Sequence, residues 1–330
     1  MKKNILAILK VLISVGLAAF LLFLVFRNIE WVDFWQKATE VDYSWVIASV
    51  VLSIIPYVAR AYRWNILLKP LGHDLKTSRT TLAVLIGYLA NLALPRLGEL
   101  TRCGVLNRND KVPVPDALGT VIVERLVDVL TLLVLMGLSM FIEYERLMKF
   151  LTEALAGLAL PNWVIIALPI IAILGLAMLI LFLRNQRKKE GKLSSIIKGF
   201  TNGLLSLKDI SNPMGFVIST LAIWVAYFLM SYIIVFSLPE TSHLDLSAGL
   251  MLLITGGIAL ALPVQSGFGT YHGMIAGMLL LYSVEVDTGI FLATLLHTSQ
   301  IIAIAFFGTT ALIISALIRR KKTEKVHEFL

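Results

Sequence analysis

The sequence predicts an all-α polytopic integral membrane protein with six clear membrane spans and two broken or re-entrant hairpins, arranged as an inverted repeat. Three observations carry this prediction. Of the 330 residues, 58% are hydrophobic and only 15% are charged, against about 25% charged residues in a soluble domain. Lysine and arginine are very unevenly divided between successive loops. The tetrapeptide Leu-Ala-Leu-Pro occurs twice, at 92–95 and at 260–263, each time at the end of an apolar segment.

Six apolar segments are long enough to cross a bilayer, which takes about 17–25 residues. The first could also be a signal peptide. Its apolar stretch is longer than the core of a signal peptide, and no small-residue cleavage motif precedes Arg27, so we expect a retained helix. The six predicted spans are residues 5–26, 43–59, 117–142, 163–183, 214–238 and 289–318.

The basic residues predict which loops face the cytoplasm, because cytoplasmic loops carry an excess of lysine and arginine. With both termini placed in the cytoplasm, 24 of the 29 basic residues lie on the cytoplasmic side and four lie outside. We therefore expect a multi-pass protein of the cytoplasmic membrane with both termini cytoplasmic. Its largest loop, 184–213, is predicted to be a basic cytoplasmic segment. We expect this loop to be too short for a separate soluble catalytic domain.

Regions 80–106 and 246–282 contain the two Leu-Ala-Leu-Pro breaks, where proline and glycine stop a helix. Backbone freed of helical hydrogen bonds at bilayer depth must face protein or water, since lipid cannot satisfy it. The charge distribution requires 80–106 to enter and leave from the cytoplasm, and 246–282 to enter and leave from outside. Each region is either a re-entrant hairpin or a pair of full crossings, and the polar character of 97–106 favours re-entry for the first.

The two halves of the chain have the same order of elements: span, span, hairpin, span. Three crossings are an odd number, so the second membrane repeat, 151–330, is predicted to be inverted relative to the first, 1–150, within one integral domain. Inverted repeats with broken helices near the middle of the bilayer are typical of alternating-access transporters. The alternative is that the tetrapeptide recurs by chance in a chain rich in leucine and alanine.

Three charged residues, Glu124, Arg125 and Asp128, lie well inside the apolar segment 117–142. An ionisable side chain near the bilayer centre costs about 2.5–3.5 kcal/mol and indicates function. Glu124 and Asp128 are four residues apart and share one helix face. We expect Arg125 to receive a phosphate, and the carboxylates to balance arginines, relay protons or contact a cationic headgroup. The alternative is a structural ion pair that locks two helices.

A second group of charges follows the first break. Arg96 and Arg102 are predicted to bind phosphate, because the guanidinium fork matches phosphate oxygens. Glu99 can balance them, or pair locally with Arg102 at a spacing of three residues. Asn91, four residues before Pro95, is expected to hydrogen-bond backbone freed by the break. The alternative places these arginines at the cytoplasmic surface, where they only set the orientation of the chain.

The sequence Arg60-Ala-Tyr-Arg63-Trp64 closes the second predicted span. Arginine and tryptophan at such a boundary are usually interfacial anchors. Binding of a lipid headgroup by Arg60 and Arg63 is the alternative.

The second break offers uncharged donors and acceptors in a glycine-containing loop. Gly267-x-Gly269 is weak as a nucleotide-binding motif, because no third glycine follows at the required spacing. His272 and His297 could meet inside the bundle, but two histidines are weak evidence for a metal. We expect neither metal nor cofactor. The residues assigned to the two broken hairpins are Asn91, Pro95, Gly98, Pro263, Gln265, Gly267, Gly269 and His272.

The formal net charge of +8 would suggest nucleic acid as the partner of a soluble protein. Here the basic residues are explained by membrane orientation and by anionic lipid headgroups, so no nucleic-acid partner is expected. Cys103 is the only cysteine, which excludes an intrachain disulfide. Glycine patches at 249–257 and 273–277 permit close helix packing within one chain or in a homo-oligomer.

The order and spacing of these motifs resemble the membrane region of lysylphosphatidylglycerol synthases over about residues 10–320. In the full-length synthases this region moves aminoacylated lipid across the bilayer, and a soluble C-terminal domain attaches the amino acid. We expect no such domain after Leu330, so the resemblance implies a stand-alone flippase-like protein that translocates lipid without aminoacylating it. The motifs are Arg60-x-x-Arg-Trp64, Asn91-x-x-x-Pro-Arg-x-Gly-Glu-x-x-Arg102, Glu124-Arg-x-x-Asp128, and Pro263 with Gly267-x-Gly269.

We therefore expect a flippase or scramblase for a phospholipid or another lipid with an anionic headgroup, such as a polyprenyl phosphate. No Walker A sequence is present, so movement is expected to be downhill or ion-coupled, without ATP hydrolysis by this chain. One alternative is an integral-membrane transferase acting on a lipid-linked substrate, with Glu124 and Asp128 as base and metal ligand. Another is a membrane scaffold without transport, for which the intramembrane charges are dispensable.

Overall fold

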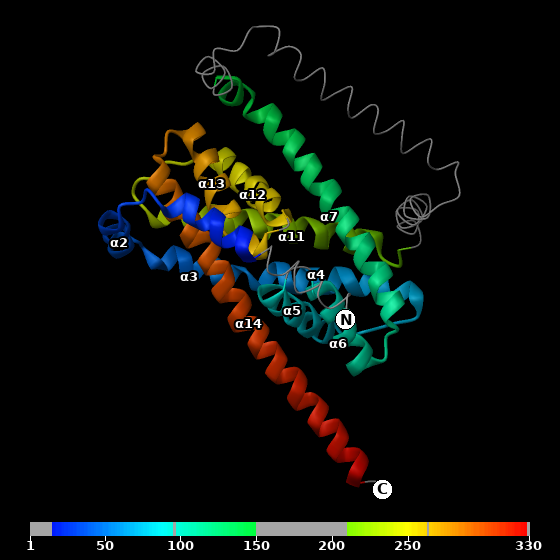
Figure 1. Cartoon of the computed structure of the whole chain (residues 1–330). Coiled ribbons are helices and arrows are strands. Elements are labelled where there is room, and N and C mark those ends of the chain that lie inside the picture. The colour runs from blue at the N-terminus through cyan, green and yellow to red at the C-terminus, as the bar shows by residue number, and fades with distance from the viewer. Residues whose placement is uncertain (1–14, 95–96, 150–209, 263, 329–330) are drawn as a thin grey trace.

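Every element in the described part of the chain is a helix, as the sequence predicts (Figure 1). The computed structural model describes residues 15–94, 97–149, 210–262 and 264–328. A helix at Val15–Phe26 comes first. It is followed by α2 (Trp31–Glu40), α3 (Tyr43–Leu52), α4 (Ile54–Leu68), α5 (Thr77–Ala93), α6 (Leu97–Asp110), α7 (Val114–Ile142), α11 (Pro213–Ile233), α12 (Leu246–Ala261), α13 (Thr270–Leu279) and α14 (Val286–Glu328), with short 3-10 turns η1 (Lys69–Leu71), η3 (Ile234–Ser237), η4 (Gln265–Gly267) and η5 (Leu280–Tyr282).

Among the described residues, three helical stretches are long and apolar enough to cross a membrane: Tyr43–Leu71, Pro213–Ser237 and Val286–Ile318. They overlap three of the six predicted spans, 43–59, 214–238 and 289–318, and the first extends beyond its predicted end to Leu71. A fourth exists if Val15–Phe26 and α2, which are bent by 88°, form one broken span. The predicted span 117–142 forms most of α7, which is not one of these stretches. The predicted span 163–183 and most of the segment 184–213 lie outside the described residues, so the count of six spans stays a prediction.

Several helices begin where a side chain satisfies backbone N–H groups that the first helical turn leaves free. Asp42 accepts a hydrogen bond from Ser44 N at 3.0 Å at the start of α3. Asn212 accepts one from Gly215 N at 2.9 Å at the start of α11, where Pro213 is the first helical residue. Asp245 caps α12 in the same way.

Both Leu-Ala-Leu-Pro tetrapeptides end a helix, which confirms the two predicted breaks. α5 ends at Ala93 and α12 ends at Ala261. After the first break α6 packs back along α5. Two glycines allow the close approach, because a Cβ added to Gly98 would lie 2.3 Å from the carbonyl oxygen of Gly87.

After the second break the chain makes η4 with backbone in the left-handed region. Ser266 has φ 48°, Gly267 has φ 73° and Gly269 has φ 80°. The two glycines adopt this conformation without the steric cost of a side chain. The chain then turns into α13. Whether either hairpin re-enters the membrane or crosses it fully stays a prediction.

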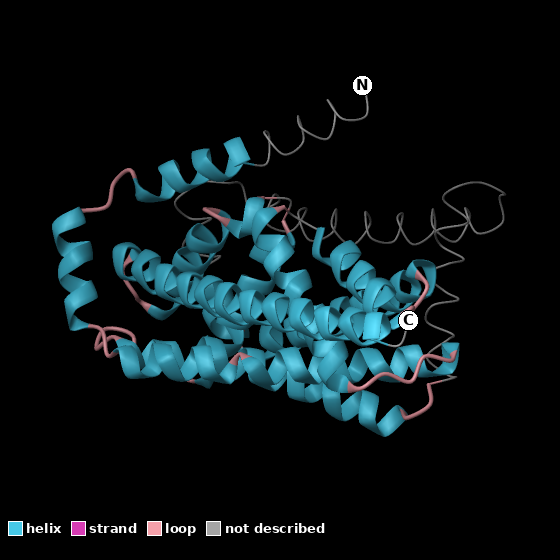
Figure 2. Cartoon of the chain, turned by 90° about the horizontal axis from the view of Figure 1, so that it is seen from below, coloured by secondary structure: helices cyan, strands magenta, loops and turns pink. Residues whose placement is uncertain are grey.

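The long helices lie against one another so that the two hairpins become neighbours. α14 packs against both α5 and α13, and α11 packs against both α4 and α12. Figure 2 shows the resulting bundle of helices from below, without strands in the described residues. Buried apolar side chains gather in one cluster around α12, α13 and α14, and in a second cluster between α4, α5, α6 and α7. The charged residues of the next section lie beside the second cluster.

Candidate functional site

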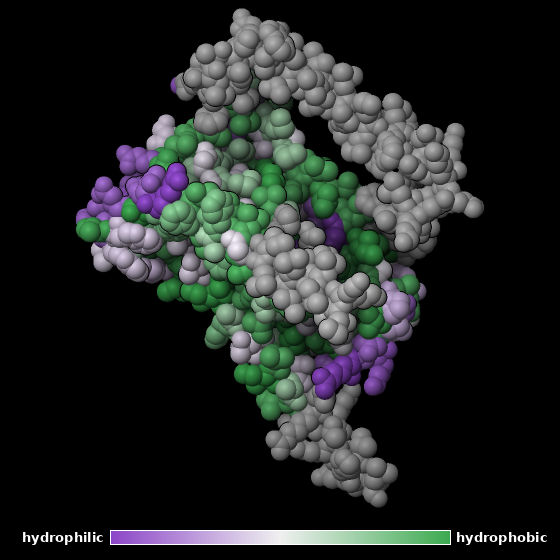
Figure 3. All heavy atoms as spheres, in the orientation of Figure 1, coloured by the Kyte–Doolittle hydropathy of each residue, from purple (hydrophilic) through white to green (hydrophobic). Residues whose placement is uncertain are grey.

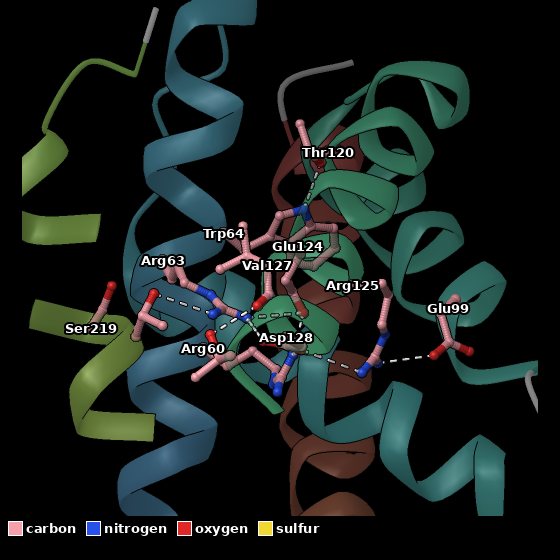
Figure 4. A network of polar contacts seen from close by, with 12 residues as sticks. Arg60, Arg63, Trp64, Glu99, Thr120, Glu124, Arg125, Val127, Asp128 and Ser219 are labelled. Atoms are coloured by element: carbon pink, nitrogen blue, oxygen red, sulfur yellow. Dashed lines mark hydrogen bonds and ion pairs between the residues drawn. The ribbon is translucent and has the colours of Figure 1, made fainter. Parts of the chain in front are cut away.

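Three helices bring seven charged side chains together, and we call this group the charged cluster (Figure 4). α4 supplies two arginines one turn apart, α6 supplies a glutamate and an arginine from the segment after the first break, and α7 supplies three charges from its apolar middle. The members are Arg60, Arg63, Glu99, Arg102, Glu124, Arg125 and Asp128.

Glu124 is fully enclosed within the charged cluster, with a side chain that is 0% exposed. Arg102 donates to Glu124 from both terminal nitrogens at 3.2 Å, and Arg60 donates to the same carboxylate from Nη1. The Arg102 guanidinium also stacks over the ring of Trp64, 4.6 Å from the centroid. A buried carboxylate of this kind needs its partners, because a charge left unpaired away from water is very costly.

Asp128 lies one turn along α7 and joins the arginines of α4 to Arg125. Arg63 Nη2 donates to Asp128 at 2.6 Å and Arg60 Nη1 donates to it at 2.8 Å. Arg125 Nη1 lies 3.7 Å from the same carboxylate. Glu124 and Asp128 therefore share a helix face, as their spacing predicts, and both face Arg60.

Arg125 and Glu99 form the open edge of the charged cluster. Arg125 Nη2 donates to Glu99 Oε1 at 2.9 Å, and the two side chains are 42% and 26% exposed. In Figure 3 a recessed hydrophilic area lies among apolar side chains where Figure 1 places α7. The other five side chains of the charged cluster are at most 13% exposed. Arg125 and Glu99 are therefore the members of the charged cluster that are most accessible from outside the protein.

The charged cluster contains four arginines and three carboxylates, which leaves one positive charge in excess. The Nε atom of each arginine and Oε2 of Glu99 are buried without a hydrogen-bond partner in the structure. Buried donors that lack partners favour binding of a group that can accept from them. The arrangement is therefore suited to one additional anion, such as a phosphate.

Three polar side chains that the sequence analysis did not single out extend the charged cluster. Arg60 Nη2 lies 3.4 Å from the Tyr227 hydroxyl, which in turn lies 3.4 Å from the Tyr88 hydroxyl. Arg63 Nη1 donates to Thr220 Oγ1 at 3.3 Å. α11 and α5 carry these residues, and no spacing pattern along the chain marks them, because their role depends on packing between helices.

Two expectations about the arginines are wrong. Arg60, Arg63 and Trp64 were expected to be interfacial anchors, but they are 3%, 0% and 0% exposed and lie inside the protein. Glu99 and Arg102 do not pair with each other locally; Glu99 bonds Arg125, and Arg102 bonds Glu124. The physical reason is that carboxylates on α7 are available to both α4 and α6 once the helices pack. Arg96, Pro95 and Pro263 lie outside the described residues.

The two breaks meet each other in the fold. Asn91 Oδ1 accepts a hydrogen bond from Gly98 N at 2.7 Å, which confirms that Asn91 satisfies backbone freed at the first break. Gln265, from the second break, donates from Nε2 to the carbonyl oxygens of Leu92 at 3.0 Å and Ala93 at 3.3 Å. These carbonyls belong to the last turn of α5, which has no helical donors left for them. Gln265 thus ties the second hairpin to the first.

Two histidines also meet beside the second break, as the sequence analysis allowed. The rings of His272 on α13 and His297 on α14 are 5.2 Å apart between centroids. His297 Nε2 lies 2.9 Å from the carbonyl oxygen of Ser266. His297 therefore holds the strained loop that carries Gln265.

Replacing Gln265 by leucine is expected to lower the unfolding free energy by about 1–3 kcal/mol, because two carbonyls at the end of α5 lose their donor. The midpoint of thermal unfolding in detergent measures the effect. Gln36→Leu is the matched control, since the Gln36 amide bonds Glu40 at an exposed site and a surface change is worth at most about 0.5 kcal/mol. Equal midpoints for the two variants would show that other donors serve these carbonyls.

Comparison of the sequence with known proteins also indicates a membrane protein. Residues 8–308 match the family described as the lysylphosphatidylglycerol synthase TM region. The chain is 24% identical over 265 residues to a protein named glycosyltransferase AglD from Haloferax volcanii, and this match covers 71% of the chain and 42% of AglD. The chain thus spans less than half the length of that relative.

A second relative is a UPF0104 membrane protein from Methanocaldococcus jannaschii, 24% identical over 250 residues, with 69% of this chain and 71% of that protein covered. No solved structure matches the chain significantly. The family match extends over nearly the whole sequence and includes every residue of the charged cluster. The chain is therefore a membrane protein that belongs to the family of the lysylphosphatidylglycerol synthase transmembrane region.

Proposed function

We propose that the protein translocates a phospholipid, or another lipid with an anionic headgroup, across the cytoplasmic membrane as a flippase or scramblase. The observation that carries the proposal is the charged cluster, with one arginine in excess and an open edge at Arg125 and Glu99. A lipid phosphate at this edge would accept from Arg125 and balance the excess charge. In the proposed mechanism this chain hydrolyses no ATP.

The junction of the two breaks supports the same proposal. Transport sites in secondary transporters lie between repeats at discontinuous helices. Here Gln265 joins the second break to Leu92 and Ala93 at the first, although 173 residues separate Gln265 from Leu92 in the chain. We propose that the halves 1–150 and 151–330 are inverted repeats that move about this junction, with both termini in the cytoplasm.

The downhill direction for a charged headgroup follows from the membrane potential. Moving one elementary charge across the bilayer is worth about 2.3 kcal/mol per 100 mV. An anionic headgroup is therefore driven outward across a membrane that is negative inside. Glu124 and Asp128 are bound by arginines, so in this proposal they hold the arginines in place rather than bind the lipid directly.

Lipid translocation in proteoliposomes tests the proposal. We expect the protein to accelerate exposure of headgroup-labelled phosphatidylglycerol to a membrane-impermeant quencher. Arg125→Gln is expected to slow this about tenfold to hundredfold, since a hydrogen bond to a charged group is worth about 1.5–3 kcal/mol. Arg146→Gln is the matched control: Arg146 is 40% exposed, against 42% for Arg125, and pairs with Glu143 at 2.8 Å just beyond α7. Arg146→Gln should transport like the wild type.

Three outcomes would contradict the proposal or its site. If the protein accelerates the movement of no anionic, zwitterionic or polyprenyl-phosphate lipid, with and without ion gradients, lipid translocation is not its function. Equal rates for Arg125→Gln and Arg146→Gln would remove Arg125 from the path. Full transport by a variant with all of Arg102, Glu124 and Arg125 neutralised would favour a role of these charges in stability alone.

A transferase acting on a lipid-linked substrate is the second candidate, and one observation favours it. The chain is similar to part of a protein whose name describes a glycosyltransferase. The match covers only 42% of that relative. The name describes that whole protein, so for this chain a transferase activity is only a candidate. A lipid product of changed mass after incubation of proteoliposomes with sugar nucleotides would favour the transferase.

A further inference from the structure

The helix α2 runs crosswise at one end of the bundle (Figure 2). It follows the helix Val15–Phe26 after a bend of 88°, and it precedes the membrane-length stretch Tyr43–Leu71. Its ten residues have a length of about 15 Å. A short helix between one apolar helix and the beginning of a membrane-length stretch is placed where the chain leaves and re-enters the bilayer.

Contacts with the rest of the protein fix how α2 is rotated about its axis. The ring of Phe34 lies 4.8 Å from the ring of Phe291, edge to face, and Ala38 packs against the same buried cluster. Lys37 Nζ bonds Glu240 Oε1 at 3.0 Å in the loop before α12. One side of α2 therefore packs against the rest of the protein.

The remaining two sides of α2 differ sharply in polarity. Trp31, Val32 and Trp35 are 52%, 79% and 65% exposed. At about 100° per residue they form one continuous apolar arc that adjoins the protein-facing side. The next arc carries the exposed polar side chains Asp33, Gln36 and Glu40. The helix therefore has one side packed against the protein, one exposed apolar side and one exposed polar side.

We propose that α2 lies in the plane of the membrane surface, with Trp31, Val32 and Trp35 inserted at the boundary between lipid headgroups and acyl chains. Tryptophan is enriched at that level of the bilayer, and amphipathic helices in the surface plane bury their apolar side by about 5–10 Å. The first turn of the adjoining membrane-length stretch also exposes aromatic side chains, since Tyr43 and Trp45 are 48% and 38% exposed.

The charges on α2 indicate what holds the helix on the lipid. Burial of its aromatic side chains would do so, rather than attraction to anionic headgroups. The polar side of the helix carries two carboxylates, Asp33 and Glu40. Its single cation, Lys37, is bonded to Glu240. With the orientation predicted from the basic residues, the leaflet concerned is the outer one. Association of α2 should then be insensitive to salt and to the fraction of anionic lipid.

Collision accessibility of spin labels in liposomes of phosphatidylcholine and phosphatidylglycerol tests the placement. Cys103 is buried and is the only cysteine, so Cys103→Ala provides a background without thiols. A label on Val32→Cys should collide with oxygen several-fold more often than with a water-soluble nickel chelate. A label on Asp33→Cys, one residue away on the polar side, should show the reverse. Thr39→Cys, about 20° from Val32 around the helix, provides a second lipid-facing position if Val32→Cys does not fold.

Either of two results would overturn the proposal. If the nickel chelate reaches the Val32 and Asp33 labels equally, the apolar side of α2 lies in water. If the Val32 and Thr39 labels are shielded from both oxygen and nickel, the apolar side is covered by protein, as in self-association through α2. Neither result bears on lipid translocation, so the placement of α2 stands or falls separately from the proposed function.

Discussion

Replacing Glu124 by glutamine is expected to lower the unfolding free energy by about 3–5 kcal/mol, the cost of breaking a buried ion pair by removal of one partner. Glu124 is 0% exposed, and Arg60 and Arg102 both donate to it. Glutamine has nearly the same shape but takes away the carboxylate that Arg102 pairs with, and it leaves Arg60 with Asp128 as its remaining counter-charge. The same substitution is expected to abolish lipid translocation, because Arg60 and Arg102 lose the carboxylate that holds them in the charged cluster.

The single buried cysteine provides the measurement. Cys103 adjoins Arg102 in α6 and is 0% exposed, so a thiol-reactive fluorogenic dye reports unfolding of the charged-cluster region during heating in detergent. Glu240→Gln is the matched control, since Glu240 is 40% exposed and pairs with Lys37 at 3.0 Å. An exposed pair of this kind is worth at most about 1 kcal/mol. Equal midpoints for Glu124→Gln and Glu240→Gln would show that the charged cluster does not hold the helices together.

Substituting alanine for two glycines of the same helix is expected to have opposite effects. A Cβ on Gly98 would lie 2.3 Å from the carbonyl oxygen of Gly87 and 2.6 Å from the Asn91 side chain. Because the Gly87 carbonyl oxygen belongs to the backbone and cannot rotate away, α5 and α6 must move apart, at a cost of about 1–3 kcal/mol or more. Gly98→Ala should also displace Arg102 and Glu99, and therefore reduce translocation along with stability.

Gly104→Ala is the control for that substitution. Gly104 is exposed in the interior of α6, and nothing lies within 4 Å of a Cβ added there. Alanine in an exposed helix interior is more stable than glycine by about 0.5–1 kcal/mol. Thermal unfolding should therefore place Gly98→Ala below and Gly104→Ala above the wild type. A stable Gly98→Ala variant would mean that the two arms of the first hairpin are not closely packed.

The helices and their breaks were predictable because they depend on local sequence. Long apolar stretches predict the spans at Tyr43–Leu71, Pro213–Ser237 and Val286–Ile318. Proline and glycine predict the ends of α5 and α12, because these residues interrupt helical hydrogen bonding wherever they stand. Asn91 was predictable for the same reason, since its partner, Gly98, is seven residues away.

The partners of the charged residues were not predictable in the same way. Arg60 and Arg63 stand at the end of an apolar stretch, where an anchoring role is the ordinary expectation, yet 64 to 68 residues separate them from the carboxylates that they bond on α7. Gln265 and its acceptors are even further apart in the chain. Contacts of this kind leave no periodic signal in one sequence.

The sequence by itself determined that the chain forms apolar helices, where two of them break, and which charges stand in apolar surroundings. Tertiary structure alone decided that four arginines share three carboxylates, that Arg125 and Glu99 form the open edge, and that Gln265 joins the two breaks. The physical reason is the range of the interactions. Hydrogen bonds within a helix and burial of apolar stretches act between near neighbours in sequence, whereas a buried charge is satisfied by whichever opposite charge the packing of helices brings within about 4 Å.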